Sequence, residues 1–123
     1  MASEHFSHDE LKCKHCGVEQ MDDGFLADLE LVREAMGIPL FVTSGYRCPE
    51  HNIAVSNTGP HGPHTTGRAV DIMIAGKQAY RLVSIAIKLG FTGIGVKQSG
   101  NFGNRFIHLD MLYNEHRPRI WSY

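Results

Sequence analysis

Two histidines and one aspartate combine residue types and spacing that suit a metal ion. His64 and Asp71 are seven residues apart, separated by a glycine-containing turn, and His108 lies far downstream in an alternating apolar segment. Neutral imidazole and carboxylate both bind Zn2+, and three protein ligands leave one position of a tetrahedral ion open for water. That pattern is typical of catalytic rather than structural zinc, so the sequence predicts a small zinc hydrolase.

Asp110 is the candidate nearest to these ligands for acid–base chemistry. It follows His108 by two residues, and the period of two in a strand places both side chains on one face. The carboxylate would then either take a proton from a zinc-bound water or accept a hydrogen bond from the far nitrogen of a ligand histidine. His61 and His51 are the next candidates for the general base.

The composition fits one soluble globular domain and disfavours two classes of partner. Of the 123 residues, 42% are hydrophobic and 20% are charged, which is enough to bury a core. The formal net charge is -1 and there is no basic stripe, so we expect no nucleic-acid binding. No apolar run approaches the ~20 residues of a membrane span, so we expect no membrane insertion. Eight histidines are many for this length and agree with metal chemistry.

The three cysteines cannot all be paired within one chain, and the polar, acidic N-terminus shows no signal peptide. We therefore expect a chain made in the cytoplasm, or cut from a longer precursor, without a disulfide scaffold. Cys13 and Cys16 form a CxxC pattern, which favours a reduced turn packed near Cys48, with all three cysteines dispensable for hydrolysis. The alternative is half of a second zinc site, completed by Cys48 or His15.

Apolar periodicity and chain breakers predict alternating helices and strands. The expected helices cover residues 22–36, 49–55 and 78–89, and the expected strands cover residues 40–43, 68–74, 91–96 and 105–111. Residues 56–67 are rich in loop formers and should make one wall of a cleft. The tail, residues 112–123, should fold back on the body. We expect one α+β domain over residues 1–123, with a small central antiparallel sheet flanked by helices.

Several short motifs together resemble a known family. They are SGYR at 44–47, H-x-x-G-x-A-x-D at 64–71, GIG at 93–95, HLD at 108–110 and a terminal W-S-Y. This set is similar to the zinc D-Ala-D-Ala carboxypeptidase family and its related murein endopeptidases, above all to the short members common among phage endolysins. The resemblance implies an α+β fold shared with the hedgehog signalling domain, a zinc cofactor and a peptidoglycan stem peptide as substrate.

The resemblance also implies roles for particular residues. His64, Asp71 and His108 match the zinc ligands of the family, and Arg47 matches its substrate-anchoring arginine. A guanidinium group binds a carboxylate through two parallel hydrogen bonds, and stem peptides carry carboxylates. Further substrate-binding candidates are Ser44 and Tyr46, which would hold the turn that aims the arginine, and His61.

One departure from the family pattern leaves two functions open. Many relatives place an acidic general base three residues before the last zinc histidine, but here that residue is Arg105, which cannot accept a proton. The chain is then either a peptidoglycan peptidase with its base elsewhere, or a catalytically weak or inactive zinc-containing binding domain. A purely structural zinc protein is the weakest alternative, because closed sites use four protein ligands. We expect a monomer acting on the cell wall, phage-encoded and released by a holin.

Overall fold

Five strands form one mixed sheet in the computed structural model, which describes residues 2–123. The strands are β1 (Phe41–Ser44), β2 (Ala69–Met73), β3 (Gly93–Lys97), β4 (Phe106–Asp110) and β5 (Arg119–Ser122). Their order across the sheet is β1-β2-β4-β3-β5. The first four are antiparallel to their neighbours, as predicted, whereas β5 runs parallel to β3. The sheet is therefore mixed, because the C-terminal segment adds a strand that the sequence did not predict.

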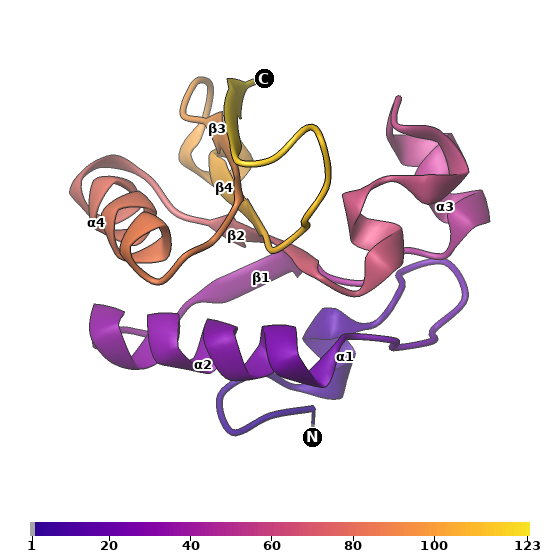
Figure 1. Cartoon of the computed structure of the whole chain (residues 1–123), viewed down its shortest axis with the longest axis horizontal. Helices are drawn as coiled ribbons and strands as arrows, with labels where there is room; N and C mark the ends of the chain where they lie inside the picture. Colours follow the sequence, from indigo (N-terminus) through magenta and orange to yellow (C-terminus); the bar gives the residue numbers. More distant parts are fainter. Residues whose placement is uncertain (1) are drawn as a thin grey trace.

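Two long helices cover one face of this sheet. They are α2 (Asp23–Met36) and α4 (Gly76–Lys88), which pack against each other (Figure 1). The α2 helix begins where Asp22 accepts a hydrogen bond from the backbone N–H of Phe25, and it ends at Gly37, whose φ of 70° only glycine adopts readily. Both helices present apolar stripes to the sheet, so the hydrophobic core lies between them and the strands.

The opposite face of the sheet carries the polar motif residues. In the pairing of β2 with β4, the apolar pairs Val70–Leu109 and Ile72–Ile107 alternate with the pair Asp71–His108. Because side chains alternate between the two faces of a strand, the apolar pairs enter the core and Asp71 and His108 share the other face.

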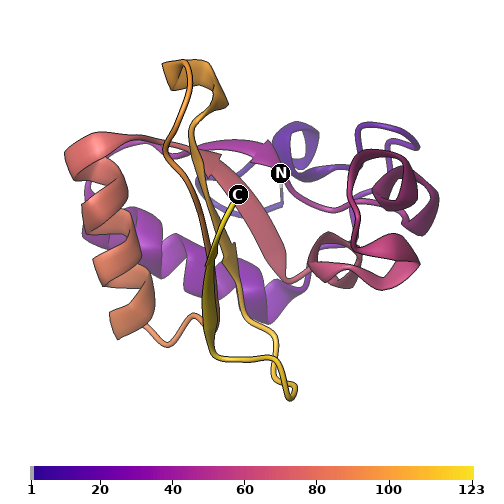
Figure 2. The ribbon, with the colours of Figure 1, turned by 90° about the horizontal axis from the view of Figure 1, so that it is seen from above.

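Four shorter elements precede β2 in the chain. They are α1 (His8–Leu11), α3 (Pro49–Val55) and two 3-10 turns, Gly59–His61 and Pro63–Thr66. The segment from α3 to the second 3-10 turn lies on the side of the sheet away from α4 (Figures 1 and 2). The α3 helix has the predicted bounds, whereas the predicted loop contains the two turns. None of the helices within residues 2–123 is long and apolar enough to cross a membrane.

Candidate metal centre

The sheet register brings Asp71 and His108 side by side, and the second 3-10 turn adds His64. The Oδ1 atom of Asp71 lies 3.0 Å from Nδ1 of His108 and 3.3 Å from Nε2 of His64. One ligand atom from each of the three residues lies within 4.8 Å of the others, and all three side chains are buried. The structure thus gathers the three predicted metal ligands around one point.

In each of the two imidazole rings, the nitrogen that points away from the predicted metal position lies against an oxygen acceptor. The Nδ1 atom of His64 lies 2.8 Å from the carbonyl oxygen of Gly45, to which it donates. The Nε2 atom of His108 lies 2.8 Å from Oδ2 of Asp110, to which it donates in the same way. In its neutral form, each ring held in this way carries its hydrogen on the far nitrogen, which leaves the lone pair of the near nitrogen directed towards Asp71.

Two such lone pairs and a carboxylate oxygen, gathered at one point, repel one another unless a positive charge lies among them. Nitrogen and carboxylate oxygen are donors that zinc accepts, and a hydrogen bond to the far nitrogen is the usual support for a histidine that binds metal. The donor set of His64, Asp71 and His108 therefore fits a zinc ion with an open coordination position.

Asp110 lies behind the His108 ring, on the side away from Asp71. Its carboxylate is completely buried and accepts three hydrogen bonds: one from His108, one from Nε of Arg117 at 3.0 Å, and one from Nη2 of Arg117 at 2.8 Å. Burial raises the pKa of Asp110, but the bonds from His108 and Arg117 outweigh this and hold it at about 2. Asp110 is thus a buried anion bound to Arg117 and turned away from the metal-facing side of His108.

The same balance holds on the metal-facing side. Burial raises the pKa of Asp71, but the neighbouring His64 and His108 rings outweigh it and hold that carboxyl well below its usual range. Burial lowers the pKa of His108, yet the hydrogen bonds to Asp110 and Asp71 raise it above its ordinary value. Both carboxylates are consequently ionised at neutral pH, which is the form that a metal ligand requires.

Two glycines of the GIG motif make room for this arrangement. A Cβ atom on Gly93 would collide with the carboxylate of Asp110, its partner across the β3–β4 pair. A Cβ atom on Gly95 would lie 2.8 Å from the indole nitrogen of Trp121. Trp121 in turn packs against the ring of His108, with the ring centroids 5.1 Å apart and the planes tilted by 51°. The glycines therefore let Asp110 and Trp121 close in on His108.

The metal-facing groups open into a cleft of about 930 Å³. One wall comes from residues 55–64 and the other from β4, β5 and the segment that joins them. Among the described residues that line it, Asp71 has the only side-chain carboxylate. The basic residues, besides His64 and His108 themselves, are Arg47, Lys97, Arg117, Arg119, His61 and His116. A cleft with this charge balance favours an anionic ligand.

Arg47 stands at the edge of the metal-facing group. Its Nη2 atom lies 3.6 Å from Oδ2 of Asp71, its Nε donates to Ser44 at 3.2 Å, and its Nη1 donates to Asn52 at 3.0 Å. Ser44 therefore touches the arginine, as predicted from the motif. Tyr46 instead packs in the hydrophobic core at 8% exposure, so its side chain belongs to the scaffold and lies outside the cleft lining.

A comparison with protein-family models identifies the family of the chain. The model described as Peptidase M15 matches residues 4–110, which is most of the chain. The chain belongs to the peptidase M15 family. M15 peptidases are zinc enzymes, so membership supports a metallopeptidase and agrees with the donor set of the centre. A comparison with curated proteins finds no match to the chain.

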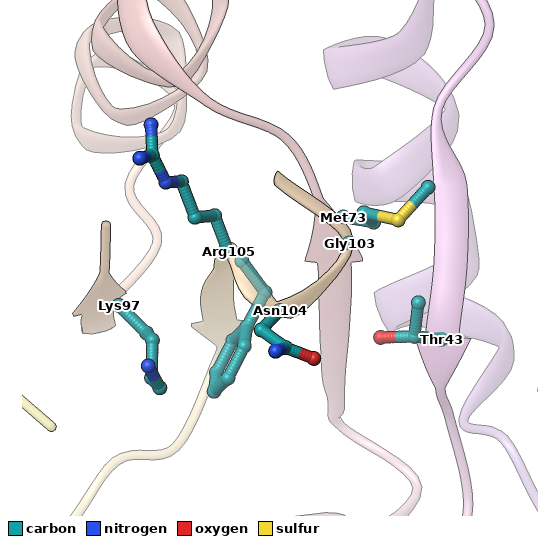
Figure 3. Close-up of a pocket in the computed structure, with 7 residues that line it drawn as sticks. Thr43, Met73, Lys97, Gly103, Asn104 and Arg105 are labelled. Atoms are coloured by element: carbon teal, nitrogen blue, oxygen red, sulfur yellow. The ribbon is translucent and has the colours of Figure 1, made fainter. Parts of the chain in front are cut away.

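Arg105 of this M15 peptidase points away from the metal-facing group. Its Nε donates to the carbonyl oxygen of Gly100 at 2.9 Å. It lines a separate pocket of about 390 Å³ with Thr43, Met73 and Lys97, and Figure 3 shows its guanidinium group directed away from Thr43. The residue at the usual position of the base thus neither accepts a proton nor faces the centre.

The two histidines considered as alternative bases lie in different places. His61 lines the cleft of the M15 peptidase. His51 lies on α3, where its ring stacks on that of His15 at 5.7 Å. Of the two, His61 is therefore the one that shares a cavity with the predicted metal ligands.

Three residues of the site were not assigned roles from the sequence. Arg117 holds Asp110, and Trp121 packs against His108. Asn52, completely buried, links Arg47 to the cleft wall by donating to Thr58 at 2.8 Å. Arg117 and Trp121 also lie beyond the residues that the M15 model matches. A buried aspartate predicts a basic partner in general, but no sequence spacing identifies which arginine provides it.

Proposed function

We propose that this M15 domain is a zinc peptidase that hydrolyses peptide bonds in peptidoglycan stem peptides or their cross-links. The proposal rests on the convergence of His64, Asp71 and His108 in a basic cleft. A hydrogen bond from the far nitrogen of each imidazole fixes its orientation. Zinc held there would supply Lewis acidity towards the scissile carbonyl group.

The chain's own groups account for substrate binding. The fork of Arg47 lies beside Asp71, so a substrate carboxylate bound to it would sit within reach of the metal-facing group. Stem peptides carry several carboxylates, and the remaining basic side chains of the cleft suit them. The exposed edge of Trp121 and the ring of Tyr123 line the same wall and offer apolar contact to the peptide.

We assign Asp110 a positioning role and the proton-accepting role to His61. The Asp110 carboxylate is fully occupied by His108 and Arg117 and is buried behind the ring, so it orients His108 instead of contacting substrate. Among the described residues of the cleft, His61 provides an imidazole on the wall opposite β4, and imidazole is the commonest general base.

A second candidate function, peptidoglycan binding without efficient hydrolysis, is favoured by one observation. Within the described residues that line the cleft, Asp71 has the sole side-chain carboxylate, and Arg105 stands where the family resemblance places the base. Such a domain would retain the metal and the basic cleft yet lack a strong proton acceptor.

The two functions separate in one assay. Purified protein is incubated with murein sacculi, with and without a chelator, and the released muropeptides are analysed. A peptidase releases new peptide ends that disappear on chelation and in His64→Ala. The exposed His8→Ala is the matched control, because His8 lies outside the cleft. Binding of sacculi without any released peptide in the zinc-loaded wild type would replace hydrolysis by binding.

The assignment of His61 is tested within the same assay. His61→Ala should reduce hydrolysis by ~100- to 10,000-fold, as expected for loss of a general base, while zinc content stays unchanged. His116→Ala is the control, because it removes another imidazole from the same cleft. If both variants retain full activity, the proton is accepted elsewhere.

A further inference from the structure

Three cysteines from two separate segments of the chain meet outside the cleft lining. Cys13 is buried, Cys48 is half-buried and Cys16 is exposed, and all three are free thiols. Their sulfur atoms lie within 4.8 Å of one another. The sequence favoured a simple reduced turn here, but a turn packed near Cys48 does not require three sulfur atoms to converge.

The backbone around the cluster directs N–H groups at two of the sulfur atoms. The N–H of Cys48 donates to Sγ of Cys13 at 3.3 Å, and the N–H of His51 donates to Sγ of Cys48 at 3.4 Å. The CxxC segment itself is a tight turn, in which the N–H of Gly17 donates to the carbonyl oxygen of Cys13 at 2.9 Å. Hydrogen bonds to a charged acceptor are the stronger kind, so these donors favour thiolate sulfur, which is the form that binds metal.

An imidazole lies beside the three sulfur atoms. The Nδ1 atom of His15 lies 3.5 Å from Sγ of Cys48, and its ring stacks on the parallel ring of His51, at 5.7 Å and an interplanar angle of 5°. Three sulfur atoms and one nitrogen form the Cys3His donor set that is common in structural zinc sites.

We propose that Cys13, Cys16, Cys48 and His15 form a second metal site that binds zinc. Thiolate ligands select zinc over the harder divalent cations such as magnesium and calcium. Four protein ligands would close the coordination sphere, so this site is structural and takes no part in hydrolysis. It is independent of the function proposed for the cleft.

The position of the site indicates that a bound metal would join two segments of the chain. Cys13 and Cys48 are 35 residues apart, so a shared ion joins the N-terminal segment to the turn that follows β1. That turn carries Arg47, and its Gly45 carbonyl orients His64. A backbone hydrogen bond joins the same two segments, because the N–H of Tyr46 donates to the carbonyl oxygen of Leu11 at 2.8 Å. A metal here would fix the turn that positions Arg47 and His64. Its binding free energy would also add to the free energy of folding.

Metal analysis of the full chain, purified under reducing conditions with zinc, tests the proposal. We expect two zinc ions per chain in the wild type and one in Cys16→Ser, Cys48→Ser or His15→Ala. Lys14→Ser, in the same turn but without a donor atom near the sulfur cluster, is the matched control and should keep two. His64→Ala should also keep one, because it removes only the cleft ion, so failure of either site is recognised separately.

Cobalt loading and thiol titration test the proposal without cysteine variants, in case one of those variants does not fold. Cobalt-loaded wild type and His64→Ala should both show thiolate-to-cobalt charge-transfer absorption, which the cleft ligands cannot produce. In the zinc-loaded wild type, all three thiols should react slowly with a thiol reagent and rapidly after a chelator is added. One zinc per chain that His64→Ala removes, with three thiols reacting at once, overturns the proposal. Loss of the second zinc in His51→Ala, with His15→Ala unaffected, overturns the assignment of His15.

Discussion

The Oδ2 atom of Asp110 lies 2.8 Å from Nε2 of His108, the ring nitrogen that faces away from Asp71. Two roles were open for Asp110 from the sequence, a general base or a partner that holds a ligand histidine. The two ring nitrogens of His108 lie on opposite sides, and Asp71 is at Nδ1. The geometry therefore favours the holding role for Asp110.

Asp110→Asn should weaken zinc affinity by ~10- to 100-fold, because the amide cannot accept hydrogen bonds from both His108 and Arg117 without turning its own N–H groups towards one of them. Activity should recover in part as zinc is added. The check is a zinc titration that follows binding and hydrolysis in parallel, with the exposed Glu115→Gln as control. A loss of rate at unchanged zinc affinity would instead restore Asp110 as the base.

Arg117→Gln should lower the free energy of unfolding by ~3–5 kcal/mol, the usual cost of leaving one partner of a buried ion pair alone. The Arg117 side chain is 8% exposed and that of Asp110 is fully buried, so water screens the pair little. Arg119→Gln is a close control, because Arg119 also lies over the ring of Trp121 but is exposed. Urea unfolding measures both, and equal losses would mean that the pair with Asp110 contributes nothing specific.

Arg47→Ala should reduce kcat/KM by roughly 10- to 150-fold, since a hydrogen bond to a charged group contributes ~1.5–3 kcal/mol. Zinc content should not change. Arg47→Lys should recover only part of the activity, because a point charge replaces the planar fork. Arg68→Ala, which removes an exposed arginine outside the cleft, is the control. If the melting temperature falls equally in Arg47→Ala and Arg47→Lys, the residue is structural.

A pH effect is expected at Glu30 on α2, which ties down the N-terminal segment. Burial raises the pKa of Glu30, but hydrogen bonds from the His5 backbone and the Ser3 hydroxyl outweigh it, so the net pKa is below its usual value. A lowered folded-state pKa gives stability that is present above the unfolded value near ~4.3 and is lost as pH falls through the folded value.

The measurement is the difference in unfolding free energy between wild type and Glu30→Gln across pH. This difference should be constant above about pH 5 and should shrink below about pH 4. Glu34→Gln, exposed on the same helix, supplies the control. A difference that grows as the solution is acidified would reverse the sign and exclude this role for Glu30.

Local sequence signals predicted the elements that they directly encode. The apolar stripe and the Gly37 stop gave the end of α2, and strand alternation put His108 and Asp110 on one face, as the structure has them. The short α1 had a readable signal as well, because Ser7 and Glu10 form a capping box, but four residues are too few for a periodic pattern.

The remaining features depend on long-range packing that no local pattern encodes. The β5 strand is mostly exposed at the sheet edge, so it lacks apolar alternation, and its parallel pairing with β3 follows from the path of the preceding loop. Arg117 reaches Asp110 from that same loop. Which nitrogen of His108 faces Asp71 is a matter of side-chain rotamer, and for that reason the role of Asp110 stayed open at the level of sequence.

The contact between Gly93 and Asp110 makes these two positions dependent on each other in evolution. A side chain at 93 needs the volume that the Asp110 carboxylate fills, and a shorter residue at 110 would leave Arg117 and His108 without their acceptor. A library of single substitutions would therefore reject almost every change at either position. Tolerated alternatives should appear only as simultaneous replacements that also change Arg117. Gly93, Asp110 and Arg117 should therefore vary together among related sequences.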